Sequence, residues 1–237
     1  MTDRSPVVAF TIDVEPDCPP YLSGFRGIDQ GMPRLLDMLA EEGIPSTFFT
    51  TGEVAARYPA VVDRIVSDGH ELASHGMTHR AFTLLDAPEA RREIDESATI
   101  LRQNAPVTSF RAPYLKFPSP YLAMLEDAGF TLDSSQARYK AAYYGDRPTT
   151  TLTRIPASVT SSVLRLPRVI RTPYLAALGS PVVLFVHPWE FVDLRRERLR
   201  IDCRFRTGDV ALRCVRTVLQ NYRAAGARFV RMAELAA

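Results

Sequence analysis

Two of the four histidines in the sequence, His75 and His79, are separated by three residues. Imidazole nitrogens are good ligands for transition metals, and on a helical turn this spacing would place both rings on one face. A pair of solvated or capping histidines would have the same spacing. The pair therefore predicts a metal site only if other segments supply a further ligand and catalytic groups.

Two carboxylates, Asp13 and Glu15, follow the first apolar segment of the chain. Residues 7–14 are typical of a buried strand, on which side chains two positions apart point the same way. Neighbouring carboxylates disfavour each other's ionisation unless a cation or shared proton relieves them, although an isolated pair can also be solvated or capping. With His75 and His79 they predict a site of two histidines and one carboxylate, open to water and substrate.

The same ligand set occurs in non-haem iron oxygenases. Those enzymes are usually built on β-rich folds, whereas in this chain short apolar runs alternate with longer amphipathic stretches. A hydrolytic metal site is therefore favoured, and the oxygenase remains a minor alternative.

Three further polar residues, Arg111, Asp133 and His187, each end a predicted strand. Arg111 either pairs with an active-site carboxylate or packs its stem on Tyr114 at the surface. A histidine after four apolar residues is often part of a core, but His187 can also act as a general acid beside a carboxylate such as Asp133. Trp189, the only tryptophan, follows closely and lines a pocket or belongs to the core.

The alternation of strands and helices predicts an α/β fold with a parallel sheet or barrel. The predicted strands are residues 7–14, 46–51, 71–74, 108–111, 131–133, 152–159, 182–187 and 228–231. The predicted helices are residues 32–42, 59–67, 88–103, 119–128 and 208–225, and residues 136–150 form a long loop. Because the polar residues fall at the carboxyl ends of strands, they should meet at the rim where active sites of parallel barrels assemble.

Composition narrows the class of protein. The 237 residues, 46% of them hydrophobic, predict one domain over residues 1–237. A net charge of +2 gives no electrostatic reason to expect nucleic-acid binding, and no apolar run has transmembrane length. Three cysteines without metal-ligand spacing favour a reducing compartment, and the N-terminal residues lack a leader pattern, so a cytoplasmic protein is expected. No pattern specifies an oligomeric state.

Taken in order, five segments resemble the motifs of the polysaccharide deacetylases with NodB homology, carbohydrate esterase family 4. They are Thr11–Glu15, His75–His79, Arg111–Tyr114, Asp133–Ser135 and Leu184–His187, the last shifted by one residue from the usual spacing. The resemblance implies a distorted (β/α) barrel of about seven parallel strands. It also implies metal-dependent removal of an N- or O-acyl group.

The resemblance assigns roles to individual residues. The implied metal ligands are Glu15, His75 and His79. The implied catalytic groups are Asp13 as general base, His187 as general acid, Arg111 orienting Asp13, and Asp133 tuning His187. The residues expected to contact substrate are Tyr114, through its backbone N–H at the oxyanion, and Trp189.

Two departures from the family pattern concern the metal. Glu15 replaces the usual aspartate, and Gly76 replaces a serine or threonine between the histidines. The metal is expected to be divalent, with zinc foremost and cobalt, nickel, manganese or iron as alternatives. A longer carboxylate must approach the metal from further back, so metal identity is the property most affected.

The expected function is removal of an acyl group, N-acetyl foremost, from an amino sugar or sugar conjugate. Residues 24–27 and 31–36 also resemble the deformylase branch that acts on lipid-linked aminoarabinose. A non-catalytic glycan-binding barrel is a further alternative, disfavoured because a binding module needs neither Asp13 nor His187. The loop at 136–150 and the arginines at 195–200 are expected to shape the pocket, unless those arginines simply form a solvated face.

Overall fold

A distorted parallel barrel, open on one side, forms the centre of the molecule in the computed structural model, which describes residues 5–145 and 148–236. Strands run in the order β6-β5-β4-β3-β2-β1-β7, and the short β8 pairs with the start of β1. They are β1 (Val7–Val14), β2 (Ser46–Thr50), β3 (Glu71–Ser74), β4 (Ser109–Phe110), β5 (Leu132–Asp133), β6 (Thr153–Arg154), β7 (Val182–Val186) and β8 (Arg228–Phe229). The predicted α/β barrel of about seven parallel strands is confirmed.

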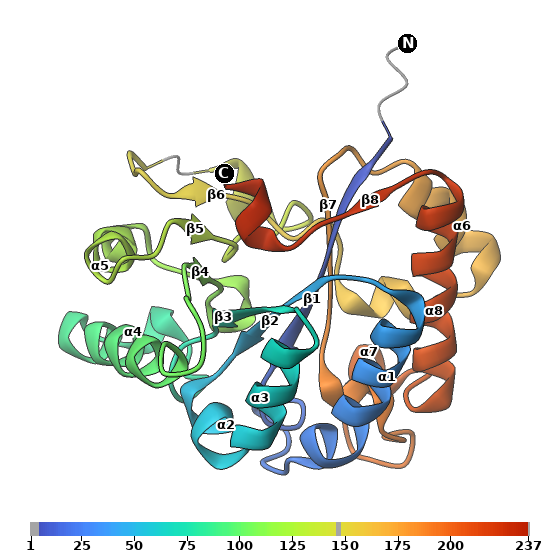
Figure 1. Cartoon of the computed structure of the whole chain (residues 1–237), viewed down its shortest axis with the longest axis horizontal. Coiled ribbons are helices and arrows are strands. Elements are labelled where there is room, and N and C mark those ends of the chain that lie inside the picture. Colours follow the sequence, from blue (N-terminus) through green and yellow to red (C-terminus); the bar gives the residue numbers. More distant parts are fainter. Residues whose placement is uncertain (1–4, 146–147, 237) are drawn as a thin grey trace.

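Helices cover the outside of the sheet (Figure 1). They are α1 (Met32–Glu42), α2 (Gly52–Arg57), α3 (Pro59–Ser67), α4 (Ala87–Leu101), α5 (Leu122–Asp127), α6 (Arg168–Ala176), α7 (Ile201–Arg204) and α8 (Asp209–Ala224). Local signals set several ends: α1 stops at the left-handed Gly43, and Asp86 with Glu89 forms a capping box at the start of α4. Among the described helices, none combines the length and apolarity needed to cross a bilayer.

The alternation of side chains along β1 decides what faces the barrel interior. Phe10 and Ile12 pack outward, in the core shared with α1 and α8, whereas Ala9 packs in the small interior cluster with Phe49 and Val183. Residues of the same parity as Ala9 therefore point inward, which aims Asp13 into the barrel.

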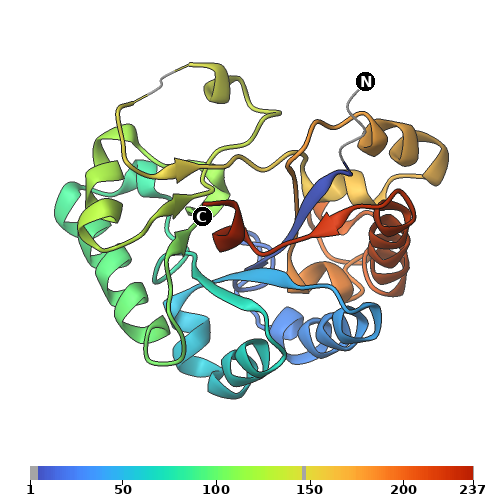
Figure 2. The same ribbon diagram turned by 45° about the horizontal axis from the view of Figure 1, so that its top comes forward.

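The amino end of the barrel is closed by the end of the chain, near the middle of the ring in Figure 2. The Met232 N–H donates to Thr47 Oγ1 at 2.8 Å, and the Ala233 N–H donates to Glu71 Oε2 at 3.0 Å. Met232 is fully buried. The polar side chains at the opposite, carboxyl ends of the strands therefore face a cavity that this plug does not fill.

Some predicted boundaries were wrong. The strand predicted at 152–159 is reduced to β6, the helix predicted at 119–128 begins as a 3-10 turn before α5, and α2, α6 and α7 were not predicted. Pro173 inside α6 contradicts a helical pattern, and α2 has only six residues, begun by the capping side chain of Thr51. Of the predicted loop at 136–150, residues 146–147 lie outside the described residues.

Candidate active site

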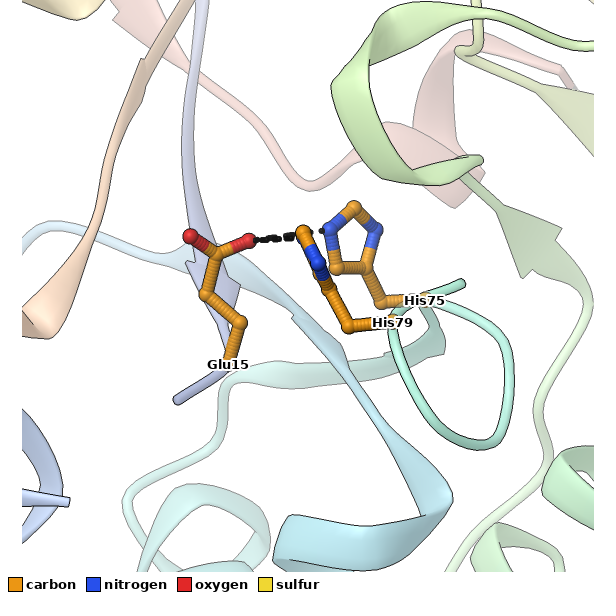
Figure 3. A group of neighbouring side chains, drawn as sticks. All are labelled: Glu15, His75 and His79. Carbon is orange, nitrogen blue, oxygen red and sulfur yellow. Dashed lines mark ion pairs between the residues drawn. The ribbon is translucent and has the colours of Figure 1, made fainter. Parts of the chain in front are cut away.

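Glu15, His75 and His79 converge at the carboxyl end of the barrel (Figure 3). Glu15 follows β1, and both histidines lie in the loop after β3. Glu15 Oε2 lies 2.5 Å from His79 Nε2 and 3.4 Å from His75 Nε2. One ligand atom from each residue lies within 4.8 Å of the others, and all three residues are buried. The expected ligand set is therefore brought together.

The histidine segment is a loop and not the helical turn that its spacing allowed. Gly76 has φ = 78° and His79 has φ = 58°, both left-handed, and these bends bring the two rings to 5.2 Å between centroids. Glycine takes such a φ without strain, which accounts for Gly76 at this bend.

Glu93, which the sequence pattern did not single out, holds this loop. It lies on the buried face of α4, and its carboxylate accepts hydrogen bonds from the Met77 N–H at 2.8 Å, the Thr78 N–H at 2.9 Å and the Thr78 hydroxyl. A charged residue among the apolar positions of an amphipathic helix was the available signal.

The His75 ring is oriented for binding a cation. His75 Nδ1 lies 2.7 Å from the Arg111 carbonyl oxygen, so it carries the proton and leaves Nε2 facing Glu15. Burial raises the pKa of the Glu15 carboxyl, but the neighbouring imidazoles, His79 and His187 foremost, outweigh it, and the pKa lies well below its usual value. An ionised carboxylate beside two imidazoles is a donor set that fits a divalent transition metal.

Trp189 orients the Glu15 carboxylate. Its indole N–H donates to Glu15 Oε1 at 3.1 Å, which leaves Oε2 for the histidine side of the site. The indole also stacks on His187, with ring centroids 4.7 Å apart and planes 17° apart. Trp189 therefore positions a ligand as well as forming part of the cavity wall.

Asp13 and Arg111 form a fully buried ion pair, as expected. Arg111 Nη1 lies 2.6 Å from Asp13 Oδ1 and 2.7 Å from Thr11 Oγ1, while Nη2 donates to Ser134 Oγ at 3.0 Å. The guanidinium also lies 4.1 Å from the centre of the Phe49 ring. Asp13 is thereby held at the cavity wall in one orientation.

The carboxylate beside His187 is Glu190 and not Asp133, so that predicted pairing was wrong. His187 Nδ1 lies 2.8 Å from Glu190 Oε1, and Glu190 Oε2 lies 2.9 Å from Arg165 Nε, with both members of this second pair 1% exposed. Although burial lowers the pKa of His187, Glu15 and Glu190 raise it to about 9.

Asp133 has other partners. Its Oδ2 accepts from Arg154 Nε at 2.9 Å and its Oδ1 accepts from the Ser135 N–H at 2.9 Å. Arg154 is the residue that faces Asp133 in the register between β5 and β6. Asp133 therefore organises the loop that carries Ser134 and Ser135, and Ser134 in turn contacts Arg111.

Gly27 and Gly31 allow the His187 segment to pack closely. A Cβ on Gly27 would lie 2.5 Å from the Trp189 backbone nitrogen, and one on Gly31 would lie 2.1 Å from the Pro188 oxygen. These two glycines therefore have a packing role in this fold, which is a simpler reason for the glycine-rich segment than its likeness to the deformylases.

A cavity of about 180 Å³ joins these groups. Of the residues predicted for the site, those that line it are Asp13, Glu15, His75, His79, Tyr114, His187 and Trp189. Lining residues that were not predicted individually include Cys18, Tyr139, Lys140, Ser161, Asp202 and Cys203. Tyr139 and Lys140 come from the predicted loop at 136–150, which does shape the cavity.

The arginines at 195–200 do not line this cavity. Arg195 pairs with Asp193 at 2.7 Å and Arg200 pairs with Asp202 at 3.0 Å, all at exposed positions. The cluster therefore forms a solvated face and adds no arginine to the cavity lining; Arg200 meets the cavity only through Asp202, which does line it.

Comparison with known proteins identifies the family. A family model described as polysaccharide deacetylase matches residues 1–132, which is more than half of the 237 residues. The chain belongs to the polysaccharide deacetylase family. A chitooligosaccharide deacetylase of Sinorhizobium fredii is 37% identical to this deacetylase-family chain over 79 residues, covering 33% of the chain and 37% of the relative. The match therefore spans little more than a third of that relative's length.

Two solved structures share the fold of this family member. A family 4 carbohydrate esterase from Streptomyces lividans, solved with acetate, superposes with a TM-score of 0.62 over 94% of this chain and 91% of its own, at 20% identity. A mutant of a pseudoenzyme of the same family, with restored activity, superposes with a TM-score of 0.68 over 99% of this chain and 69% of its own, at 16% identity. At these identities the likeness concerns the fold alone.

Proposed function

We propose that this protein is a metal-dependent hydrolase that removes an N-acetyl group from an amino sugar or a sugar conjugate. The observation that carries the proposal is one cavity lined by three metal-binding side chains, by the carboxylate of Asp13 and by the imidazole of His187. The related Sinorhizobium fredii protein is named a chitooligosaccharide deacetylase, which supports the acetylated amino sugar as substrate class.

Glu15, His75 and His79 would hold the metal, with zinc the expected ion. A divalent cation there supplies Lewis acidity, which makes water more acidic and an acyl carbonyl more electrophilic. Trp189 and the Arg111 carbonyl hold Glu15 and His75 for this purpose. Positioning groups of this kind commonly change metal affinity by about 10- to 100-fold when they are removed.

Asp13 would take the proton from the attacking water as the water oxygen adds to the acyl carbon. Arg111 fixes the orientation of this carboxylate through the 2.6 Å contact. When the carbon–nitrogen bond breaks, His187 would give a proton to the departing nitrogen, so that acetate and a neutral amine leave. Proton donation matters because an unprotonated amide nitrogen is a poor leaving group.

The test of this proposal is acetate release from N-acetylated chitooligosaccharides by zinc-loaded protein, with free acetate and free amine both measured. We expect equimolar acetate and amine, loss of turnover after chelation, and recovery on adding zinc back. Release of formate from N-formyl sugars without release of acetate would favour the deformylase alternative, which no comparison supports. Tight glycan binding without turnover under any divalent metal would identify a non-catalytic barrel.

Glu93→Gln should weaken metal binding by about 10-fold or more, because the loop between the ligand histidines loses its charged acceptor. The zinc Kd is measured by competition with a chromophoric chelator. Glu96→Gln, exposed on the same helix, is the matched control and should bind zinc like the unaltered protein. Equal zinc affinity in both variants would show that Glu93 does not position the loop.

Glu190→Gln should move the alkaline limit of activity to lower pH. The charge of Glu190 and its hydrogen bond raise the pKa of His187, so the acid form of His187 is present at low pH and is lost as pH rises through that raised pKa. Without the Glu190 charge the pKa falls, and we expect the alkaline limb of kcat to shift down by about one pH unit or more. Glu234→Gln, in an exposed pair with Arg231, should leave the profile unchanged.

The cytoplasmic location stays a prediction, based on the use of cysteine. Cys18, Cys203 and Cys214 are all free thiols in the structure. A cytoplasmic amino-sugar precursor is the substrate source that we propose with this location.

A further inference from the structure

A second cavity adjoins the catalytic one. It has a volume of about 670 Å³, against about 180 Å³ for the catalytic cavity, and the two share Pro19, His79 and Tyr114 in their walls. A ligand seated at the metal-binding side chains can therefore extend past His79 into this larger space.

The wall of the second cavity is largely hydrocarbon. Apart from the shared residues, its apolar lining includes Pro16, Pro20, Leu22, Phe25, Leu84 and Leu85. Leu84 is 82% exposed. Surface leucines are common singly, but a leucine at the edge of a proline- and leucine-lined cavity beside a reaction centre marks a place for an apolar group.

Besides the shared His79 and Tyr114, the polar lining of this cavity is Ser23, Glu53, Thr78 and Arg80, and two of these side chains are engaged elsewhere. Arg80 pairs with Glu89 at 3.0 Å, and Thr78 donates to Glu93. The catalytic cavity differs in its larger share of polar side chains, among them Asp13, His187, Tyr139 and Ser161. A sugar ring, which needs hydrogen-bond partners, therefore matches the catalytic cavity, and a hydrocarbon group matches its neighbour.

We propose that the second cavity binds an apolar aglycone, a hydrocarbon chain or ring attached to the anomeric oxygen of the acetylated amino sugar. This inference rests on the proposed function and narrows its substrate to a hydrophobic glycoconjugate. The acyl group itself must lie against Glu15, His75 and His79, whose side chains are almost fully buried. An aglycone can extend away from these residues.

The experiment compares methyl and octyl glycosides of N-acetyl-β-glucosamine as substrates of the zinc-loaded protein. Each methylene that becomes fully buried contributes about a fourfold gain. We expect kcat/KM for the octyl glycoside to exceed that for the methyl glycoside by at least about tenfold. Equal kcat/KM values for the two glycosides would overturn the proposal.

Leu84→Ser tests whether the higher kcat/KM of the octyl glycoside arises in the second cavity. It should reduce kcat/KM for the octyl glycoside several-fold and leave the methyl glycoside unchanged. Leu22→Ser provides a second test of the same wall, measured as the octyl-to-methyl ratio because Leu22 also packs against the cluster that contains Trp189. Val169→Ser is the matched control, since Val169 is 83% exposed on α6, which contributes no residue to either cavity. An octyl preference that survives both leucine variants would contradict the assigned cavity.

Two further measurements distinguish an aglycone in this cavity from an acyl chain, and distinguish failure of the cavity proposal from failure of the proposed deacetylation. Methyl N-octanoyl-glucosaminide tests the acyl side: a leucine-dependent gain for this compound, and none for the octyl glycoside, would assign the cavity to an acyl chain and overturn the proposal. Binding of the deacetylated methyl and octyl glucosaminides, measured by calorimetry, does not require turnover. A Leu84-dependent preference for the octyl compound in binding would support the cavity even if the proposed deacetylation failed.

Discussion

Replacing Asp13 by asparagine is expected to lower kcat by about 10²- to 10⁴-fold in a protein that is less stable, because Arg111 loses its ionic partner, but still folds and binds zinc. The amide has almost the same shape as the carboxylate but cannot accept the proton of the attacking water. Asp13 lines the cavity beside Glu15, and Arg111 holds it from behind at 2.6 Å. Steady-state acetate release gives kcat, and elemental analysis gives the zinc content.

Asp17→Asn is the matched control for Asp13→Asn. Asp17 is also a buried aspartate of the segment after β1, but its oxygens accept from the backbone N–H groups of Arg26 and Gly27 and it does not line the catalytic cavity. The control should change stability and leave kcat within a fewfold of the original. An Asp13→Asn protein with full zinc content and undiminished kcat would rule out Asp13 as the base.

Replacing Arg111 by methionine should destabilise the fold by about 3–5 kcal/mol, because it leaves the Asp13 carboxylate buried without a partner. Arg111 is fully buried, and its guanidinium contacts Thr11 and Ser134 as well as Asp13. The free energy of unfolding is measured by urea denaturation of the metal-free protein. The variant should also lose most of its activity, since the base loses its orientation.

Two comparisons identify the cause of the loss of stability in Arg111→Met. Arg64→Met removes an arginine from an exposed pair with Asp37, and it should cost less than about 1 kcal/mol. The double variant Asp13→Asn, Arg111→Met should be more stable than Arg111→Met alone, because no isolated charge is left inside. A single Arg111→Met variant as stable as Arg64→Met would show that the buried pair is not needed for folding.

Local patterns were sufficient for the placement of the polar residues at one rim. A strand is recognised from a short apolar run, and its alternation fixes which side chains share a face, so Asp13 and Glu15 could be placed without knowledge of the rest of the chain. Helix ends at Gly43 and Asp86 follow from equally local rules. The motif order along the chain then indicated the family, which the comparison confirmed.

The ion-pair partners of Asp133 and His187 were not predicted from the order of the motifs. Asp133 and His187 both end strands, yet β5 and β7 are separated by four other strands along the sheet, and the register gives Asp133 to Arg154 of the adjacent β6. His187 pairs instead with Glu190, three residues further along a 3-10 turn. Strand register, which motif order does not contain, selected the partner of Asp133, whereas the partner of His187 is a local i,i+3 neighbour that the motif comparison passed over.

The sequence by itself therefore determined which residue types reach the carboxyl rim, because strand boundaries and side-chain alternation are short-range properties. Only the tertiary structure decided how those residues are held. Trp189 reaches Glu15 across 174 positions of the chain, and Glu93 of α4 holds the histidine loop. Such contacts depend on how the strands order themselves and how the helices pack, which is a property of the whole barrel and not of any one segment.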